Sequence, residues 1–389
     1  MKYPLMKNNI LKSDLNQIIK YLKKKNPILT QNKNVKKFEL KWSNWLGVKY
    51  SVFVNSGSSA NFLSIAILKS EFPKGGEIIV PSFTWVSDIV SIIHHGFKPI
   101  FVDIDFVNLS MNEKEILKKI NKNTIAVFLT HAQGFNGLSN YLLKILRKKK
   151  ILLLEDVCES HGAMFYKKKL GSYGYISNFS FYYAHHMSTI EGGMICTNDK
   201  IVYEKARMLR SHGLVREIND SSLKKNFINK YKDLNPQFIF KMPGFNLRNN
   251  EIGAILGLNQ LKRLDKNIKK RNLNHKYFLS RIDKTKFYTD FNLEGSSNYA
   301  FNLIMKEKND KFVKKLMYNL NKNGIEFRRG SVGGGNQLRQ PYLKNIMKEI
   351  NPKKFPVTDH IHFYGFYIGN YPELSKKDID YICNTINKT

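Results

Sequence analysis

Short apolar runs alternate with amphipathic stretches between residues 51 and 157. The runs are strand-like, whereas the stretches between them carry apolar residues three or four positions apart, which is helical spacing. Strands that alternate with helices build parallel βαβ units, so the pattern predicts an α/β fold with helices on both faces of a mostly parallel sheet. We expect strands at 51–54, 77–81, 98–105, 124–131 and 151–157, and helices at 61–72, 86–96, 113–120 and 141–150.

A different pattern begins near residue 250. Helical periodicity continues for some 30 residues, over 251–282, which is long enough to link two domains. An alternating strand, a helix, a Gly-rich loop and a last helix follow, and this order predicts a smaller α+β domain. We therefore expect a large domain (1–250) whose first 15 or so residues pack on the small one, a linking helical region (251–282) and a small C-terminal domain (283–389).

The composition supports a folded protein of more than one domain. The chain has 389 residues, of which 42% are hydrophobic and 13% aromatic, so disorder is excluded. No apolar run approaches the roughly 20 residues of a membrane span, and the first residues lack a secretory h-region, so we expect a soluble cytoplasmic protein. The three cysteines are scattered, which excludes a disulfide scaffold and a four-cysteine cluster within one chain; they are Cys158, Cys196 and Cys383.

The formal charge of +33 raises the possibility of nucleic-acid binding. Only 11 of the 64 basic residues are arginine, however, and the lysines are spread over nearly the whole chain. Nucleic-acid readers rely on arginine forks and on basic faces interleaved with aromatic residues. We interpret the charge as a solvated lysine surface that leaves some attraction for anionic substrates, and we expect neither a nucleic-acid nor a membrane partner.

Candidate chemistry follows the predicted strands, because sites in such sheets form at the carboxyl ends of the strands. The loop NSGSSAN (55–61) has small residues before a helix, which suits either a phosphate site or a plain turn. Trp85 follows the next strand, where its indole is either part of the core or free to stack on a flat ring. Asp156 ends a buried strand and needs a cation there, either a protonated pyridine nitrogen or a structural Arg or Lys.

Two adjacent histidines, His185 and His186, lie in the segment 177–199. In an extended chain neighbouring side chains point to opposite faces, so the pair is a poor chelate and we expect no metal site. One catalytic and one structural histidine is the better interpretation.

Taken together, these segments resemble a known family. The motifs SGSSAN, PSFTWVS, LLEDVCESHGA, FSFYYAHH…EGG and PGFNLRNNEIGAILGLNQL are similar to those of the DegT/DnrJ/EryC1/StrS sugar aminotransferases over nearly all of the chain. The resemblance implies the fold type I architecture of aspartate aminotransferase, with a large domain around a mostly parallel sheet and a smaller α+β domain. It also implies the cofactor pyridoxal 5′-phosphate.

One departure from the family pattern changes the expected chemistry. Most members have a lysine six positions before the Glu of EGG, and it binds the cofactor covalently, whereas the position six before Glu191 is His185. An imidazole has no primary amine, so we expect the cofactor to be held without a covalent bond. Histidine can shuttle protons near neutral pH. The substitution resembles the 3-dehydratases that make 3,6-dideoxysugars such as colitose.

The resemblance to this branch implies a substrate and a donor. We expect removal of the C3 hydroxyl of a nucleotide-linked 4-keto-6-deoxyhexose, with L-glutamate as amino donor, pyridoxamine 5′-phosphate as the second cofactor form, and release of ammonia. GDP-4-keto-6-deoxymannose is favoured, although GGGNQLRQP (333–341) is similar to the CDP-sugar enzymes. A sister enzyme carries an iron–sulfur cluster, which normally takes four cysteines, so we expect none here. An ordinary aminotransferase and a cofactor-binding regulator remain alternatives.

The same resemblance assigns roles around the cofactor. We expect Asp156 to pair with the pyridine nitrogen, Trp85 to stack on the ring and Glu159 to lie near the ring hydroxyl. His185 is expected to carry the catalytic protons. The phosphate is expected to bind Gly57, Ser58 and Ser180.

Other roles lie further from the ring. Asn246, in GFNLR, matches an asparagine that reaches the phosphate of the neighbouring subunit, which implies a homodimer with shared active sites. Arg328 is a candidate for binding the carboxylate of glutamate or a substrate phosphate, because a guanidinium fork suits either; the alternative is a surface arginine. His212 and Arg216 are weaker candidates for the sugar-nucleotide pocket.

Overall fold

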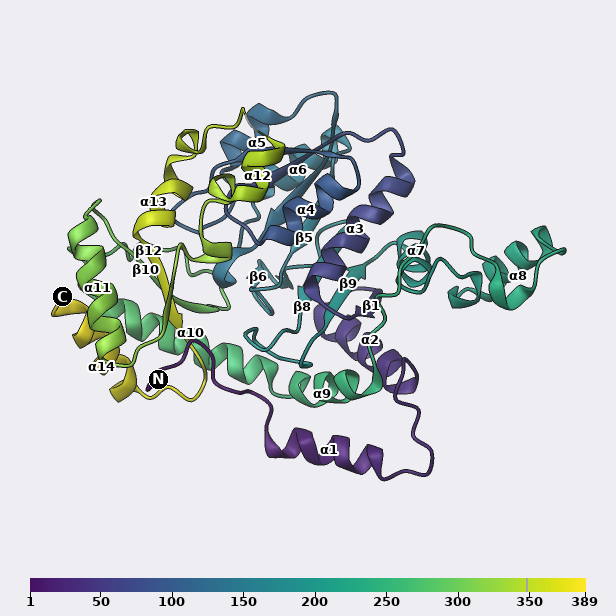
Figure 1. The fold of residues 1–389 in the computed structure, drawn as a ribbon, viewed down its shortest axis with the longest axis horizontal. Coiled ribbons are helices and arrows are strands. Elements are labelled where there is room, and N and C mark those ends of the chain that lie inside the picture. Colours follow the sequence, from purple (N-terminus) through teal and green to yellow (C-terminus); the bar gives the residue numbers. More distant parts are fainter. Residues whose placement is uncertain (348) are drawn as a thin grey trace.

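A seven-stranded sheet runs through the larger part of the computed structural model, which describes residues 1–347 and 349–389 (Figure 1). The strands follow the order β1-β9-β8-β5-β4-β2-β3 across the sheet. Their bounds are β1 Tyr50–Val54, β2 Glu77–Pro81, β3 Lys98–Val102, β4 Thr124–Thr130, β5 Leu152–Asp156, β8 Ile176–Ser180 and β9 Gly193–Thr197, and a separate two-stranded ribbon has β6 Met164–Phe165 and β7 Lys168–Lys169.

Most neighbours in this sheet are parallel, which confirms the predicted α/β fold. β1 pairs antiparallel with β9, and β9 pairs antiparallel with β8, so β1 runs in the same direction as β8, β5, β4, β2 and β3. The prediction did not include β8 and β9. Every residue of β8 is buried, yet its sequence ISNFS is largely polar, so it lacks the apolar run by which the other strands were recognised.

Helices cover both faces of the sheet because successive side chains of each strand point in opposite directions. In β1, Val52 and Val54 belong to the core beneath α3, α4 and α7, whereas Phe53 belongs to the core beneath α2 and α6. The helices of this part are α1 Lys12–Leu22, α2 Lys33–Leu46, α3 Gly57–Glu71, α4 Val86–His94, α5 Glu113–Lys119, α6 Asn140–Lys149, α7 Lys200–Arg210 and α8 Ser221–Lys230.

The C-terminal part forms a second, antiparallel sheet with the order β10-β12-β11. α10, α11 and α14 pack together beside it and share its hydrophobic core. The remaining elements are α9 Glu251–Leu261, α10 Leu264–Arg281, β10 Ala300–Ile304, α11 Asp310–Lys322, β11 Phe327–Arg329, α12 Pro341–Ile346, α13 Pro356–Tyr364, β12 Gly365–Gly369 and α14 Lys376–Asn387.

The helical periodicity over 251–282 is divided into two helices rather than continuous. α9 ends at Leu261 and α10 begins at Leu264, with Arg263 as its N-cap residue. The Arg263 guanidinium reaches α1, where it pairs with Asp14 at 2.5 Å and donates to the Asn9 carbonyl at 2.7 Å. The break therefore lies where α1 is attached to the rest of the molecule.

The chain start lies against the C-terminal sheet before α1 runs along α9 (Figure 1). Tyr3 forms a β-bridge with Ile325, and the Leu5 amide donates to the Glu326 carboxylate at 2.8 Å. α8 projects from the molecule on the side away from this sheet. No helix in the described part of the chain is both long enough and apolar enough to span a membrane.

Candidate active site

The ends of several strands meet at one edge of the large sheet and surround a cavity of about 670 Å³. β1, β5 and β8 end at this edge, and β9, which runs the opposite way, begins there. Another wall of the cavity comes from the C-terminal sheet. Eight of the residues predicted from the sequence line this one cavity, namely Gly57, Ser58, Trp85, Asp156, Glu159, Ser180, His185 and Arg328.

Asp156 lies at the end of β5, lines the cavity and has 3% of its surface exposed. One carboxylate oxygen accepts from the Cys158 amide at 2.8 Å, and the other accepts from the Asn61 side-chain amide at 3.0 Å. Among the described residues no Lys, Arg or His pairs with it. Within the described part of the chain Asp156 therefore has no structural Arg or Lys partner, and it lines the cavity.

The loop after β1 forms a tight corner of the cavity. Ser56 caps α3 by accepting from the Ser59 amide at 3.0 Å. Gly57 and Ser58, the first two residues of the helix, line the cavity, and N–H groups at a helix start have no partner within the helix. A Cβ on Gly57 would lie 2.5 Å from Ser180 Cβ and 3.2 Å from Cys158 Sγ. Glycine thus brings the helix start against the end of β8, leaving a polar corner of a kind that suits a phosphate.

Trp85 precedes α4 and lines the cavity with 51% of its surface exposed. The alternative that Trp85 is a core residue is therefore wrong. An exposed indole beside a cavity offers a flat face to a ring.

Glu159 lies on the same side of the cavity, three residues beyond Asp156. Its carboxylate accepts from the Gln133 amide at 3.0 Å. Burial nevertheless raises the pKa of Glu159 to about 7, and the negative charge of Asp156 contributes. A carboxyl group with this pKa can donate or accept a hydrogen bond at neutral pH.

The two histidines are separated as the sequence suggested. His185 lines the cavity, whereas His186 is buried and its Nε2 lies 3.1 Å from the Ser297 carbonyl. Burial lowers the pKa of His185 to about 4, although the charge of Asp156 acts in the opposite direction. In the cofactor-free site His185 is therefore a neutral base at pH 7, rather than a group that is half-protonated there.

The C-terminal sheet supplies the opposite wall. Arg328 of β11 lines the cavity together with Tyr367 of β12 and Tyr299, which immediately precedes β10. Arg328 forms no ion pair with a described acidic residue. Burial raises the pKa of Tyr367 to about 12, so it is a neutral donor beside the guanidinium.

Three predicted residues do not line the cavity of their own chain: Asn246, His212 and Arg216. All three are exposed, and Asn246 accepts from Arg248 at 3.1 Å. Arg216 stacks over Phe238, 5.5 Å from the ring centroid. Within one chain, these three residues therefore do not lie with the eight predicted residues that line the cavity.

Some residues of the cavity were not predicted. Asn61 lies within the quoted motif SGSSAN, and its apolar neighbours at helical spacing were the available signal that it faces the sheet. Leu5, Met6 and Tyr299 belong to no motif, and they reach the cavity only through contacts between distant segments.

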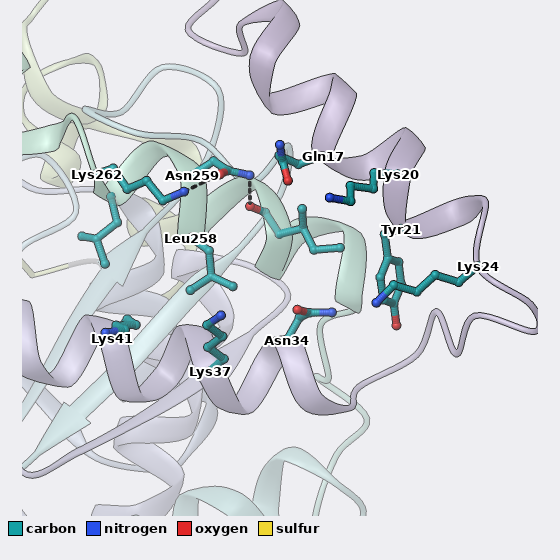
Figure 2. A pocket seen from close by; sticks show the side chains of 12 residues that line it. Gln17, Lys20, Tyr21, Lys24, Asn34, Lys37, Lys41, Leu258, Asn259 and Lys262 are labelled. Atoms are coloured by element: carbon teal, nitrogen blue, oxygen red, sulfur yellow. Dashed lines mark hydrogen bonds between the residues drawn. The ribbon is translucent and has the colours of Figure 1, made fainter.

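A second cavity, of about 600 Å³, lies between α1, α2 and α9 and contains none of the predicted residues (Figure 2). Figure 2 shows lysines from all three segments around it, and no acidic residue is among the described residues that line it. In the described ranges no group of three or more His, Cys, Asp or Glu is placed to hold a metal ion. Cys158 lies in the loop after β5, Cys196 in β9 and Cys383 in α14.

Known proteins resemble this chain over its whole length. GDP-4-keto-6-deoxy-D-mannose 3-dehydratase of Escherichia coli is 33% identical over 364 residues, which cover 91% of this chain and 92% of that protein. The structure of that enzyme with bound hydrated PLP has a TM-score of 0.88 at 30% identity and covers 99% of each chain. A structure described as GDP-4-keto-6-deoxymannose-3-dehydratase with a trapped PLP–glutamate geminal diamine has a TM-score of 0.87 at 29% identity, covering 99% of this chain and 100% of that one.

The model of one family matches residues 9–387, which include every residue predicted for the site. The chain belongs to the DegT/DnrJ/EryC1/StrS aminotransferase family.

Proposed function

We propose that the chain is a pyridoxal-phosphate- and pyridoxamine-phosphate-dependent 3-dehydratase of a nucleotide-linked 4-keto-6-deoxyhexose, with L-glutamate as amino donor. One observation carries the proposal: His185 lines the cavity, and none of the described lining residues is a lysine. A family aminotransferase needs a lysine amine at this place. The 3-dehydratases that this chain resembles support the reaction, and their names favour GDP-4-keto-6-deoxymannose as substrate.

The residues present fit the cofactor. Asp156 is buried without a basic partner, so it can hold the proton of a pyridine nitrogen. Trp85 offers its exposed ring for stacking, and Glu159 can hydrogen-bond a ring hydroxyl. The corner formed by Gly57, Ser58 and Ser180 supplies backbone N–H groups and hydroxyls for a phosphate. The bound cofactor would supply an electron sink for bonds broken next to the amine.

His185 moves the protons in this proposal. As a neutral base, His185 accepts the α-proton of glutamate on one of its own ring nitrogens. As an imidazolium, it gives a proton to the C3 hydroxyl, which leaves as water. Glutamate is oxidised to 2-oxoglutarate, and its two electrons reduce C3 to a methylene. Because no lysine is present to displace the nitrogen, water releases it as ammonia together with the 4-keto-3,6-dideoxysugar nucleotide.

Arg328 binds an anion in the same proposal. Its guanidinium faces the cavity without an acidic partner, so it is free to take the carboxylate of glutamate or a nucleotide phosphate. Asn246, His212 and Arg216 are exposed and outside the cavity of their own chain. We assign them to a shared site in a homodimer, where Asn246 of one subunit reaches the phosphate of the other.

A CDP-linked substrate is the second candidate, because Gly333 and Gly334, in the segment that resembles the CDP-sugar enzymes, line the cavity. The test is incubation of purified protein with pyridoxal phosphate, L-glutamate and GDP-4-keto-6-deoxy-D-mannose, following ammonia and the mass of the sugar nucleotide. Loss of one oxygen with ammonia release is expected. A gained amino group would instead identify an aminotransferase, and 2-oxoglutarate without a changed sugar would move the test to the CDP-sugar.

A further inference from the structure

Asp88 is a buried carboxyl group that the proposed reaction leaves without a role. It is the third residue of α4 and has no exposed surface. One of its oxygens lies 2.5 Å from the side-chain nitrogen of Asn61, and the other accepts from the hydroxyl groups of Thr84 and, at 2.9 Å, Thr130. These contacts fix the carboxyl group on both sides.

Asn61 joins this carboxyl group to Asp156. The Asn61 side-chain nitrogen contacts Asp88 at 2.5 Å, Asp156 at 3.0 Å and the Ser87 hydroxyl at 3.0 Å. An amide nitrogen has two hydrogens, so it cannot satisfy three acceptors. The carboxyl groups of Asp88 and Asp156 therefore lie against the same nitrogen atom. A proton on one of them would supply the hydrogen that Asn61 lacks.

The charges around Asp88 point to the same conclusion. The titratable groups that face it are Asp156 of β5, Cys158 of the following loop and Tyr342 of α12, all of which are acids. Neither carboxyl group forms an ion pair with a described basic residue. Burial, and then the charge of Asp156, raises the pKa of Asp88 well above its usual range. Two adjacent carboxylates in such surroundings cannot both be ionised.

We propose that Asp88 keeps a proton at neutral pH and, as an uncharged acid hydrogen-bonded to Asp156, holds a single negative charge opposite the ring nitrogen of the cofactor. Asp88 is thus a positioning residue that acts through Asp156. Its effect on the cofactor rests on the proposed function, whereas the protonation of the pair does not.

The first experiment uses the cofactor-free protein. The infrared difference spectrum between wild type and Asp88→Asn at pH 7 is expected to show the carbonyl band of one protonated carboxylic acid, which asparagine cannot give. Asp103→Asn serves as the matched control, because Asp103 is also buried but accepts from the backbone amides of Val357 and Thr358. Absence of the band from the Asp88 difference spectrum would overturn the proposal.

A second variant keeps the test decisive if Asp88→Asn does not fold. Asp156→Asn removes the neighbouring charge, so the Asp88 acid band is expected to disappear at a lower pH than in wild type. An unchanged midpoint would contradict the coupling between the two groups.

The effect on the cofactor is measured by absorbance. Wild type with bound pyridoxal phosphate is expected to show an alkaline spectral transition when the pair loses its proton, and Asp88→Asn is expected to lack it. Identical transitions would refute the link to the cofactor. If neither protein binds pyridoxal phosphate, the proposed function fails, while the infrared result still decides the protonation of the pair.

Discussion

Replacing Gly57 by alanine tests the close approach that forms the phosphate corner. The added Cβ would lie 2.5 Å from Ser180 Cβ and 2.9 Å from Ser180 Oγ, whereas carbon atoms normally approach to about 3.5–4.0 Å. Gly57 does not have a positive φ, so alanine brings no backbone strain of its own. Because Ser180 Cβ is attached to the buried strand β8, the helix start or the strand must move.

Overpacking of this kind costs about 1–3 kcal/mol. We expect Gly57→Ala to lower the unfolding free energy of the cofactor-free protein by that amount, measured by urea denaturation. The same displacement moves the N–H groups of the first turn, so the affinity for pyridoxal phosphate, measured by absorbance titration, is expected to fall by about 5- to 150-fold if the full cost appears in binding.

A double variant separates packing from binding. Ser180→Gly removes the two nearest atoms, so that Cys158 Sγ, at 3.2 Å, is the next atom from the new Cβ. Adding Gly57→Ala to Ser180→Gly is therefore expected to cost little stability, so the two substitutions are non-additive by about 0.5–3 kcal/mol. Cofactor affinity stays weak because the Ser180 hydroxyl is absent. Strictly additive stabilities, or a Gly57→Ala protein that binds as wild type does, would refute the reasoning.

Three other substitutions test the site and the surface. His185→Lys introduces a primary amine into the cavity, so borohydride treatment of the variant with pyridoxal phosphate should give a covalent adduct that is detectable by mass, and dehydration should be lost. Absence of the adduct would contradict the placement of His185. Glu159→Gln should remove one contribution to the pH dependence of stability. Because the pKa of Glu159 is raised from 4.5 to about 7, the unfolding free energy of wild type relative to the variant, measured by urea denaturation, should fall by up to about 3 kcal/mol as the pH rises from 4.5 to 7. Lys20→Glu combined with Lys37→Glu should lower the salt concentration that elutes the protein from heparin without changing the affinity for pyridoxal phosphate. A changed affinity would show that the lysine-lined cavity between α1, α2 and α9 is not independent of the candidate active site.

The sequence predicted residues on the sheet side of the cavity, because the carboxyl ends of parallel strands lie at the same edge of a sheet. Apolar runs identified five of the seven strands of the large sheet, and the polar residues immediately after β1 and β5 had to lie together once the strands were parallel. β8 and β9 were not predicted, and the reversed direction of β9 cannot be read from its composition. It nevertheless places the loop that contains His185 at the same edge.

The opposite wall could not be predicted in the same way. Tyr367 lies in β12 and Tyr299 immediately precedes β10, two strands that pair across some 65 residues, and Met6 comes from the chain start. Their place depends on how two cores and a terminal segment pack, for which local periodicity carries no information. The Tyr183 hydroxyl, for example, reaches the Met6 carbonyl at 3.3 Å, across 177 positions.

Ionisation is the property that sequence reasoning predicted least well. A histidine in water suits both proton uptake and proton release near pH 7, and this was the expectation for His185. Burial lowers its pKa to about 4, so in the cofactor-free site it is well suited to accept a proton but holds one poorly. The same burial raises the pKa of Glu159 to about 7 and also raises that of Asp88, so protons are held on acids rather than on the imidazole. An acid role for His185 therefore requires negative charge to be brought near it when the ligands bind, and the substrate phosphates and the glutamate carboxylates are the groups that carry such charge.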